Sequence, residues 1–203
     1  GLRDFIADIQ DLLLDAIDQA VDSVVSATGL ELPFWSISAV AVEGTNLVLS
    51  STGEVAIDLE LKRGWNMVSV PVIPADPSTD VVFAGTEAVY TWNPQTKSYT
   101  MPDTIEPERG YWVAVMSDDT ITVSGVPVTE WESQLYTGWN MGGSIHGASV
   151  QVADLDDVPA DSIQTNAVYT WDPVAKSYTT AAAIEQGKGY WLATIEDCTL
   201  TMP

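Results

Sequence analysis

Aromatic residues recur at fixed spacing in two parts of the chain and are its strongest candidates for a binding surface. In an extended strand, two residues in alternate positions place their side chains on the same face. The candidate ligand-binding residues are Tyr90, Trp92, Tyr99, Tyr169, Trp171 and Tyr178. Exposed rings of this kind stack on sugar rings or anchor a partner protein, whereas buried ones fill a core and pair across strands. Both interpretations are open at the level of the sequence.

A short acidic stretch supplies the candidate metal ligands. Its carboxylates are Asp154, Asp156, Asp157 and Asp161. Carboxylate oxygens are the ligands that calcium prefers, so the sequence predicts no cofactor and leaves calcium as a possible ligand of this stretch. The alternative is a solvated acidic loop, which a chain so rich in acidic residues is expected to contain.

Residue types that carry hydrolytic chemistry are few. The only histidine, His146, follows Ser144 by two residues, and neighbours on one strand face lack the alignment of a nucleophile with its base. The only cysteine, Cys198, has no histidine nearby in the sequence to activate it. A glycosidase that uses two facing carboxylates is the remaining enzymatic alternative. We predict that the chain is not an enzyme.

The aromatic candidates belong to a tandem repeat. The heptapeptide AVYTWNP at 88–94 returns as AVYTWDP at 167–173, and the tetrapeptide GWNM at 64–67 returns at 138–141. Other segments also recur: KSYT at 97–100 and 176–179, and GYW at 110–112 and 189–191. Self-similarity at a fixed period is the signature of repeated structural units. We therefore define a first repeat, 55–126, and a second repeat, 127–203.

Each repeat is predicted to consist of short strands. In the first repeat they are expected at about 65–73, 87–93, 97–102, 110–116 and 120–125, with a single helical turn after Ser78. An Asn or Asp followed by Pro marks a tight turn in each copy. Asn66 and Asn140 are expected to hold the backbone of a turn. The pattern predicts a mainly β chain with one small β-sandwich or barrel per repeat.

The segment before the repeats has a different periodicity. Apolar residues recur every three or four positions over 4–28, acidic ones occupy the opposite side, and Gly29 stands where a helix C-cap is expected. This predicts an amphipathic helix in an N-terminal segment 1–30, followed by a β-hairpin in 31–54. A lone helix is only marginally stable in water, so its apolar face is expected to cover the β part of its own chain or to mediate self-assembly or binding of a protein partner.

The charge of the chain restricts its partners. The 203 residues include 29 acidic and 7 basic ones, giving a net charge of −22. Such a field repels nucleic acid and anionic membrane surfaces. It suits solubility in a saline habitat or the collection of divalent cations. No apolar run is long enough to span a membrane, and a chain that begins at Gly1 is expected to be part of a longer or processed product.

The motif series GWN…YTW[ND]P…KSY…GYW resembles a repeat found near the C-termini of large secreted and cell-surface proteins of bacteria and archaea. Residues 64–126 match the pattern throughout, and 138–203 match except where Gly142-Gly143-Ser144 replaces Val68-Ser69-Val70. The resemblance implies an extracellular or cell-surface location and a non-catalytic structural or adhesive role. The alternative is a module that binds polysaccharide through its Tyr/Trp hairpins.

Overall fold

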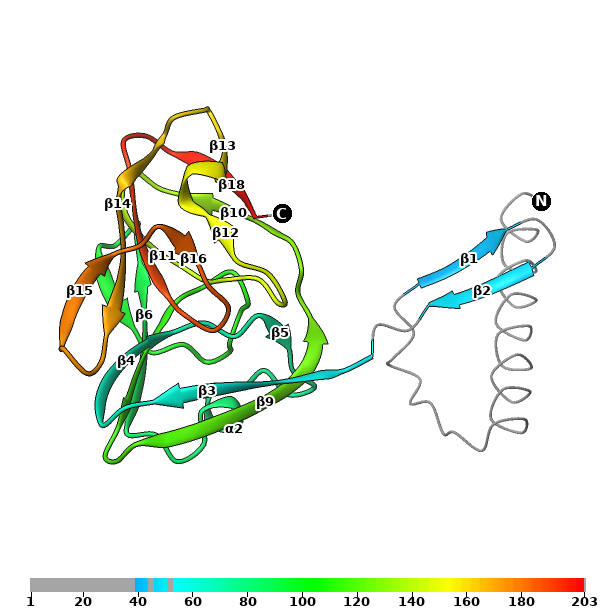
Figure 1. The fold of residues 1–203 in the computed structure, drawn as a ribbon, viewed down its shortest axis with the longest axis horizontal. Coiled ribbons are helices and arrows are strands. Elements are labelled where there is room, and N and C mark those ends of the chain that lie inside the picture. The colour runs from blue at the N-terminus through cyan, green and yellow to red at the C-terminus, as the bar shows by residue number, and fades with distance from the viewer. Residues whose placement is uncertain (1–38, 44–45, 51–52, 203) are drawn as a thin grey trace. The chain divides into compact units, whose positions relative to one another are not determined.

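The computed structural model describes residues 39–43, 46–50 and 53–202 of the chain (Figure 1). The chain divides into two compact units, Gly1–Gly53 and Glu54–Pro203. In the first unit, β1 (Ala39–Glu43) and β2 (Asn46–Ser50) form an antiparallel hairpin. The helix predicted over 4–28 lies outside the described residues.

The first repeat folds into two antiparallel sheets. Its elements are β3 (Val55–Leu61), β4 (Gly64–Val68), β5 (Val72–Ile73), α2 (Thr79–Val82), β6 (Ala88–Asn93), β7 (Ser98–Thr100), β8 (Tyr111–Val115) and β9 (Asp119–Pro127). One sheet has the strand order β3-β9-β5 and the other β4-β8-β6-β7. In Figure 1, β3 lies beside β9, and the pairing runs from Val55 opposite Gly125 to Leu61 opposite Asp119. The single helical turn α2 begins after Ser78, as the sequence predicts.

The second repeat has sheets of closely related order. Its elements are β10 (Trp131–Leu135), β11 (Gly138–Gly142), β12 (Val150–Gln151), η2 (Val152–Asp154), β13 (Asp156–Val158), β14 (Ile163–Asp172), β15 (Ser177–Thr180), β16 (Ala183–Ile184), β17 (Tyr190–Thr194) and β18 (Cys198–Met202). The sheets run β10-β18-β13, β11-β17-β14-β15 and β12-β16. The four-stranded sheet therefore matches that of the first repeat strand by strand. The prediction of a mainly β chain is confirmed.

Each repeat buries its own hydrophobic core between its sheets. Strand β3 alternates as its sequence predicts: Ile57 and Leu59 are buried while Asp58 and Glu60 are exposed. Its buried face meets β8 residues such as Val113 in the first core. The second core is equivalent in plan and joins the sheets through aliphatic residues of β10, β14, β17 and β18. Burial of these side chains at roughly 25 cal/mol per Å² of apolar surface is the main stabilising contribution in each repeat.

Side chains at corresponding positions fold the turns of the two repeats. Asn93 accepts hydrogen bonds from the backbone N–H groups of Gln95 and Thr96, at 3.0 and 3.1 Å. Asp172 does the same for Val174 and Ala175, at 2.8 and 2.9 Å. These bonds mimic a backbone turn and explain why Asn or Asp stands at each tip.

The two asparagines of the GWN motifs are buried and hold turns, as predicted. Asn66 accepts a bond from the N–H of Lys62 and donates one to its carbonyl, both at 2.8 Å. Asn140 makes the same pair with Tyr136, at 2.9 and 2.7 Å. A buried amide is stable only when its polar groups are paired, so these bonds fix the connections that precede β4 and β11.

The two repeats also bond to each other through their backbones. The N–H of Ser69 donates to the carbonyl of Gly187 at 2.9 Å, and that of Gly143 donates to the carbonyl of Glu108 at 2.8 Å. The two backbones also approach so closely at Gly110 and Gly189 that a side chain would not fit at either position. A Cβ atom on Gly110 would lie 2.8 Å from the carbonyl oxygen of Gly142. One on Gly189 would lie 2.7 Å from that of Val68. Residues 54–202 therefore form one compact unit rather than two independently folded domains.

Candidate functional site

The aromatic residues lie on the faces of the four-stranded sheets that point away from the cores. On β8, Tyr111 and Val113 enter the first core, so Trp112 between them faces the opposite side. Trp191 holds the matching position on β17. Together with Met67 and Met141 these two tryptophans form a buried cluster between the repeats, with Tyr90, Trp92, Tyr169 and Trp171 partly buried around it.

The tryptophans of the hairpins cross from one repeat to the other. Trp171 packs edge to face on Trp112 with 5.3 Å between ring centroids, and Trp92 packs in the same way on Trp191 at 5.5 Å. Edge-to-face contacts of this type stabilise by about 0.5–1.5 kcal/mol beyond burial alone. The indole N–H of Trp171 donates to the carbonyl of Trp65 at 2.9 Å, and that of Trp92 to the carbonyl of Trp139 at 2.8 Å. Each repeat thus contacts the other through a hairpin tryptophan, and the two contacts are equivalent.

Two pockets open between these rings. The first aromatic pocket has a volume of about 500 Å³ and is lined by Trp65, Tyr90, Tyr99, Trp112, Trp171 and Tyr178. The second aromatic pocket has a volume of about 460 Å³ and is lined by Trp92, Tyr99, Trp139, Tyr169, Tyr178 and Trp191. All six aromatic residues that the sequence singles out line one or both pockets. Tyr99 and Tyr178 line both.

Four tryptophans of the pockets are not among the residues predicted from sequence as ligand-binding. Trp65 and Trp139 come from the two GWN motifs, and Trp112 and Trp191 come from the two GYW motifs. Their repetition is a visible signal, but the sequence does not show that four separate motifs of each copy, GWN, YTW, KSY and GYW, meet at one place. Pairing of β4 with β8 and of β8 with β6 brings them together.

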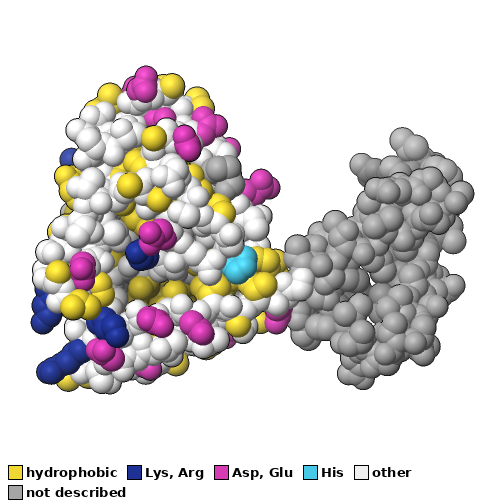
Figure 2. Space-filling view, viewed as in Figure 1, with side chains coloured by type: hydrophobic (Ala, Val, Ile, Leu, Met, Phe, Trp, Pro, Cys, Tyr) yellow, Lys and Arg dark blue, Asp and Glu magenta, His cyan; other side chains and the backbone are white. Residues whose placement is uncertain are grey.

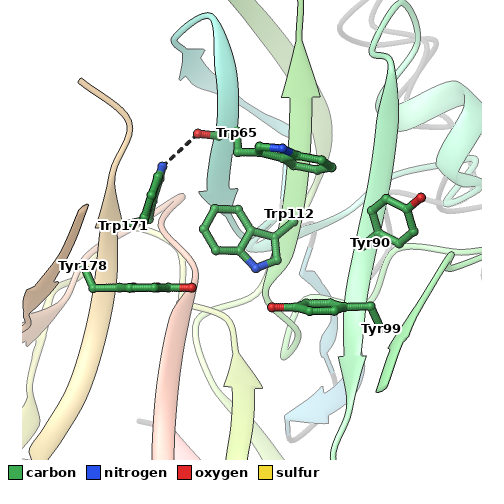
Figure 3. A pocket seen from close by; sticks show the side chains of 6 residues that line it. All are labelled: Trp65, Tyr90, Tyr99, Trp112, Trp171 and Tyr178. Carbon is green, nitrogen blue, oxygen red and sulfur yellow. Dashed lines mark hydrogen bonds between the residues drawn. The ribbon is translucent and has the colours of Figure 1, made fainter. Parts of the chain in front are cut away.

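The rings of the first aromatic pocket stand at steep angles to one another. Trp65 and Trp112 are 6.3 Å apart and 88° out of plane, and Trp65 and Tyr90 are 6.0 Å apart at 48°. In Figure 3 the ring of Trp65 lies above and that of Tyr99 below, with Trp112 on one side and Tyr90 on the other. Four rings thus bound one space.

The second aromatic pocket repeats this geometry. Trp139 lies 6.2 Å from Trp191 at 80° and 6.0 Å from Tyr169 at 51°. The two pockets are therefore equivalent in their walls as well as in their volume.

The pockets are open to solvent and nearly free of polar groups. Trp65 is 45 % exposed, Trp139 46 %, and Tyr99 and Tyr178 49 % each. The hydroxyls of Tyr99 and Tyr178 point toward one another across the boundary between the pockets (Figure 3). Burial, and to a lesser extent the neighbouring Tyr178, raises the pKa of Tyr99. The indole N–H of Trp191 is directed to the hydroxyl of Tyr178 at 3.3 Å.

The four candidate calcium ligands lie in a short segment that runs from the end of η2 through β13 to the turn that follows it. Asp156 and Asp157 are adjacent on β13, so their side chains point to opposite faces. The carboxylate of Asp157 accepts a hydrogen bond from the N–H of Ile163 at 2.9 Å, and Asp161 adopts a turn conformation with φ 63°. Among the described residues, including Asp154, no group of three or more His, Cys, Asp or Glu side chains is placed to hold a metal ion. On the face shown in Figure 2, acidic side chains are dispersed rather than gathered.

Ser144 and Cys198, the residues considered as nucleophiles, lie in surroundings that do not activate them. The hydroxyl of Ser144 is buried and lies 2.8 Å from that of Ser69, and it accepts a bond from the N–H of Gly187 at 2.9 Å. Within residues 53–202, none of the hydrogen bonds of Ser144 involves His146. Burial above all, and then the nearby Asp157, raises the pKa of the Cys198 thiol and disfavours the reactive thiolate.

Comparison with known proteins adds no assignment. No protein-family model, no curated protein and no solved structure matches the chain. In the part of the chain that the structure describes, no helix has the length and apolarity needed to cross a membrane. Among the described residues, the twin aromatic pockets are the candidate site that the geometry supports, because the same repeated aromatic residues line both.

Proposed function

We propose that this chain is a non-catalytic structural module of an extracellular or cell-surface assembly, in which two copies of one small β-sandwich, 55–126 and 127–203, are locked into a single rigid body. The observation that carries the proposal is the reciprocal contact of the hairpin tryptophans. Trp92 reaches the backbone of Trp139, and Trp171 reaches that of Trp65. The same surface of each copy meets the other, as in an isologous dimer interface.

A locked pair suits a structural role because the relative orientation of its two halves is fixed. Edge-to-face tryptophans, backbone bonds between the repeats and glycines in close contact all act on this one interface. The resemblance of the GWN…GYW series to repeats of prokaryotic surface proteins supports the same role, as does the strongly acidic composition.

Binding of a polysaccharide is less well supported by the geometry. A sugar presents many hydroxyl groups, and a site for it needs side chains that pair with them. The walls of both aromatic pockets consist only of Trp and Tyr, and several of their N–H groups are already bonded within the protein. A glycosidase would require two facing carboxylates, and neither aromatic pocket has one in its lining.

The N-terminal segment extends the proposal to assembly. An amphipathic helix over 4–28 would attach the module to a copy of itself or to a partner through its apolar face. Deletion of 1–28 should then reduce the mass of the particle in light scattering. If that helix covers its own chain instead, the deletion should lower stability at unchanged mass.

The structural role is tested by substitution of Trp92 with Ala. We expect a marked loss of thermal stability because the residue joins the repeats, and no binding of glycans by either the wild type or the variant. Tryptophan fluorescence during heating measures the first, and a glycan array measures the second. A stable Trp92→Ala protein that loses retention on a glycan bound by the wild type would overturn the proposal in favour of carbohydrate binding.

A further inference from the structure

The two aromatic pockets have the construction of a cage rather than of a flat platform. In the first, Trp65 stands nearly perpendicular to Trp112 and faces Tyr99 across the space (Figure 3). A flat ligand such as a sugar ring stacks on one face, whereas walls at right angles surround a compact, roughly spherical group. The shape therefore selects a small globular ligand.

The chemistry of the walls selects a cation. The faces of Trp and Tyr rings carry negative potential from the ring quadrupole, and a cation within about 6 Å of a ring centroid is attracted to it. The unit that holds the pockets adds to this attraction, because residues 54–203 contain 21 acidic and 6 basic residues. An anion would be repelled by both features.

The walls of the pockets contain few hydrogen-bond acceptors, and this restricts the chemical class of the cation further. A primary ammonium or a guanidinium brings several N–H donors that need acceptors when they leave water. In each cage the linings offer only Tyr hydroxyls, and that of Tyr178 already accepts from Trp191. A fully alkylated nitrogen has no N–H to satisfy and presents methyl groups to the rings.

We propose that the two aromatic pockets are equivalent binding sites for a small soluble quaternary ammonium compound that carries a trimethylammonium group, as choline does. One group occupies each pocket, between Trp65 and Tyr99 in the first and between Trp139 and Tyr178 in the second. Each chain therefore binds two such cations. This inference goes beyond the proposed structural role. Trp92 and Trp171, which join the repeats, also line the pockets, but the half-exposed side chains of Trp65 and Trp139 do not form the contacts between the repeats, so their substitution tests binding separately from the structural role.

The probe that tests the charge is choline, compared with its neutral isostere 3,3-dimethylbutanol. Calorimetric titration of the full chain should give two choline sites per chain, weakened as salt is added. The isostere has the same shape and apolar surface without the charge, so it should bind at least about tenfold more weakly. Equal binding of the two compounds, or no binding of choline, would overturn the proposal.

Substitution of one solvent-facing tryptophan at a time tests the location. Trp65→Ala should abolish one site and leave the other, Trp139→Ala should do the converse, and the double variant should bind no choline. Ile73→Ala, at a position 55 % exposed and outside both pockets, is the matched control and should keep two sites. Because Trp65 and Trp139 each pack on two other rings, their loss should lower the melting temperature. Choline binding is therefore measured at a temperature at which every variant is folded by circular dichroism. Two choline sites in the folded double variant would place binding elsewhere and refute the assignment.

Lipids and modified proteins also carry a trimethylammonium group, and their binding is measured in separate experiments. Sedimentation with phosphatidylcholine vesicles tests a lipid headgroup, and titration with a trimethyllysine peptide tests a modified protein. A proline-rich peptide tests the other kind of ligand that aromatic grooves accept. Stronger binding of any of these than of choline itself would overturn the assignment to a small soluble cation.

Discussion

The indole N–H of Trp171 donates a hydrogen bond of 2.9 Å to the backbone carbonyl of Trp65, a residue of the other repeat. The bond fixes the β14–β15 hairpin of the second repeat beside the first strand of the opposing four-stranded sheet. Its counterpart runs from Trp92 to Trp139. Since the acceptor is a backbone carbonyl, the side chains of Trp65 and Trp139 remain free to line the pockets.

This arrangement predicts the effect of Trp171→Phe. The ring contact with Trp112 is largely kept while the N–H is lost, so the free energy of unfolding should fall by about 0.5–1.5 kcal/mol. Urea denaturation followed by fluorescence measures it. Trp92→Phe is the matched variant and should give the same loss. An unchanged midpoint in both would show that the two bonds contribute nothing to stability.

The close approach of the repeats predicts that Gly110→Ala and Gly189→Ala are destabilising. The added methyl groups would meet backbone oxygens at 2.8 and 2.7 Å, so the repeats must move apart. Overpacking of this kind costs about 1–3 kcal/mol. Gly53→Ala is the control, because a Cβ atom at that position would have nothing within 4 Å. Equal stability of all three variants in thermal denaturation would contradict a tight interface.

Buried tyrosines predict a loss of stability at alkaline pH. Burial, more than any other factor, raises the pKa of Tyr190 to about 12, and its hydroxyl accepts a bond from the N–H of Glu185 at 2.8 Å. The unfolded chain therefore releases this proton first, at a pKa near 10.0. The stability that Tyr190 contributes is complete below pH 10 and is lost as the pH rises toward 12.

Tyr190→Phe isolates this effect. The variant should be less stable at neutral pH by about 1–3 kcal/mol, because the N–H of Glu185 loses its partner. It should also lose less stability than the wild type between pH 10 and 12. Chemical denaturation at a series of pH values measures both effects, and parallel pH profiles of the two proteins would exclude a role for Tyr190.

Two exposed aspartates predict a loss of stability in acid. Asp197 accepts bonds from the N–H and hydroxyl of Thr137, at 2.7 and 2.8 Å, and Asp118 accepts one from the N–H of Arg63 at 2.9 Å. In both, a backbone hydrogen bond is the main cause that lowers the pKa from 3.8. Their contribution is present above pH 3.8 and is lost as the pH falls through the lower folded-state value.

The substitution Asp197→Asn checks this prediction. It should remove part of the acid dependence of stability, as should Asp118→Asn in the first repeat. NMR titration of the carboxyl carbons gives the two pKa values directly. Values at or above 3.8 would contradict the hydrogen-bond assignment.

The sequence alone predicted the mainly β class, the helical turn after Ser78 and the role of Asn66 and Asn140 in their turns. These features depend on local patterns: alternation of apolar residues, residues that favour turns, and short-range bonds between side chains and backbone. It also selected Tyr90, Trp92, Tyr99 and their partners in the second repeat as one family of positions. The helix predicted over 4–28 remains a prediction.

The tertiary structure alone decided how those positions meet. From the sequence, Trp92 could have been a core residue or part of an exposed platform; in the structure it crosses to Trp191 and bonds to the backbone of Trp139. The candidate calcium ligands, from Asp154 to Asp161, are close in the sequence. Among the described residues, however, no three of their carboxylates are placed to hold the same metal ion. A pocket or an interface depends on contacts between segments far apart in the chain, and no local pattern records which face of one repeat will bury itself against the other.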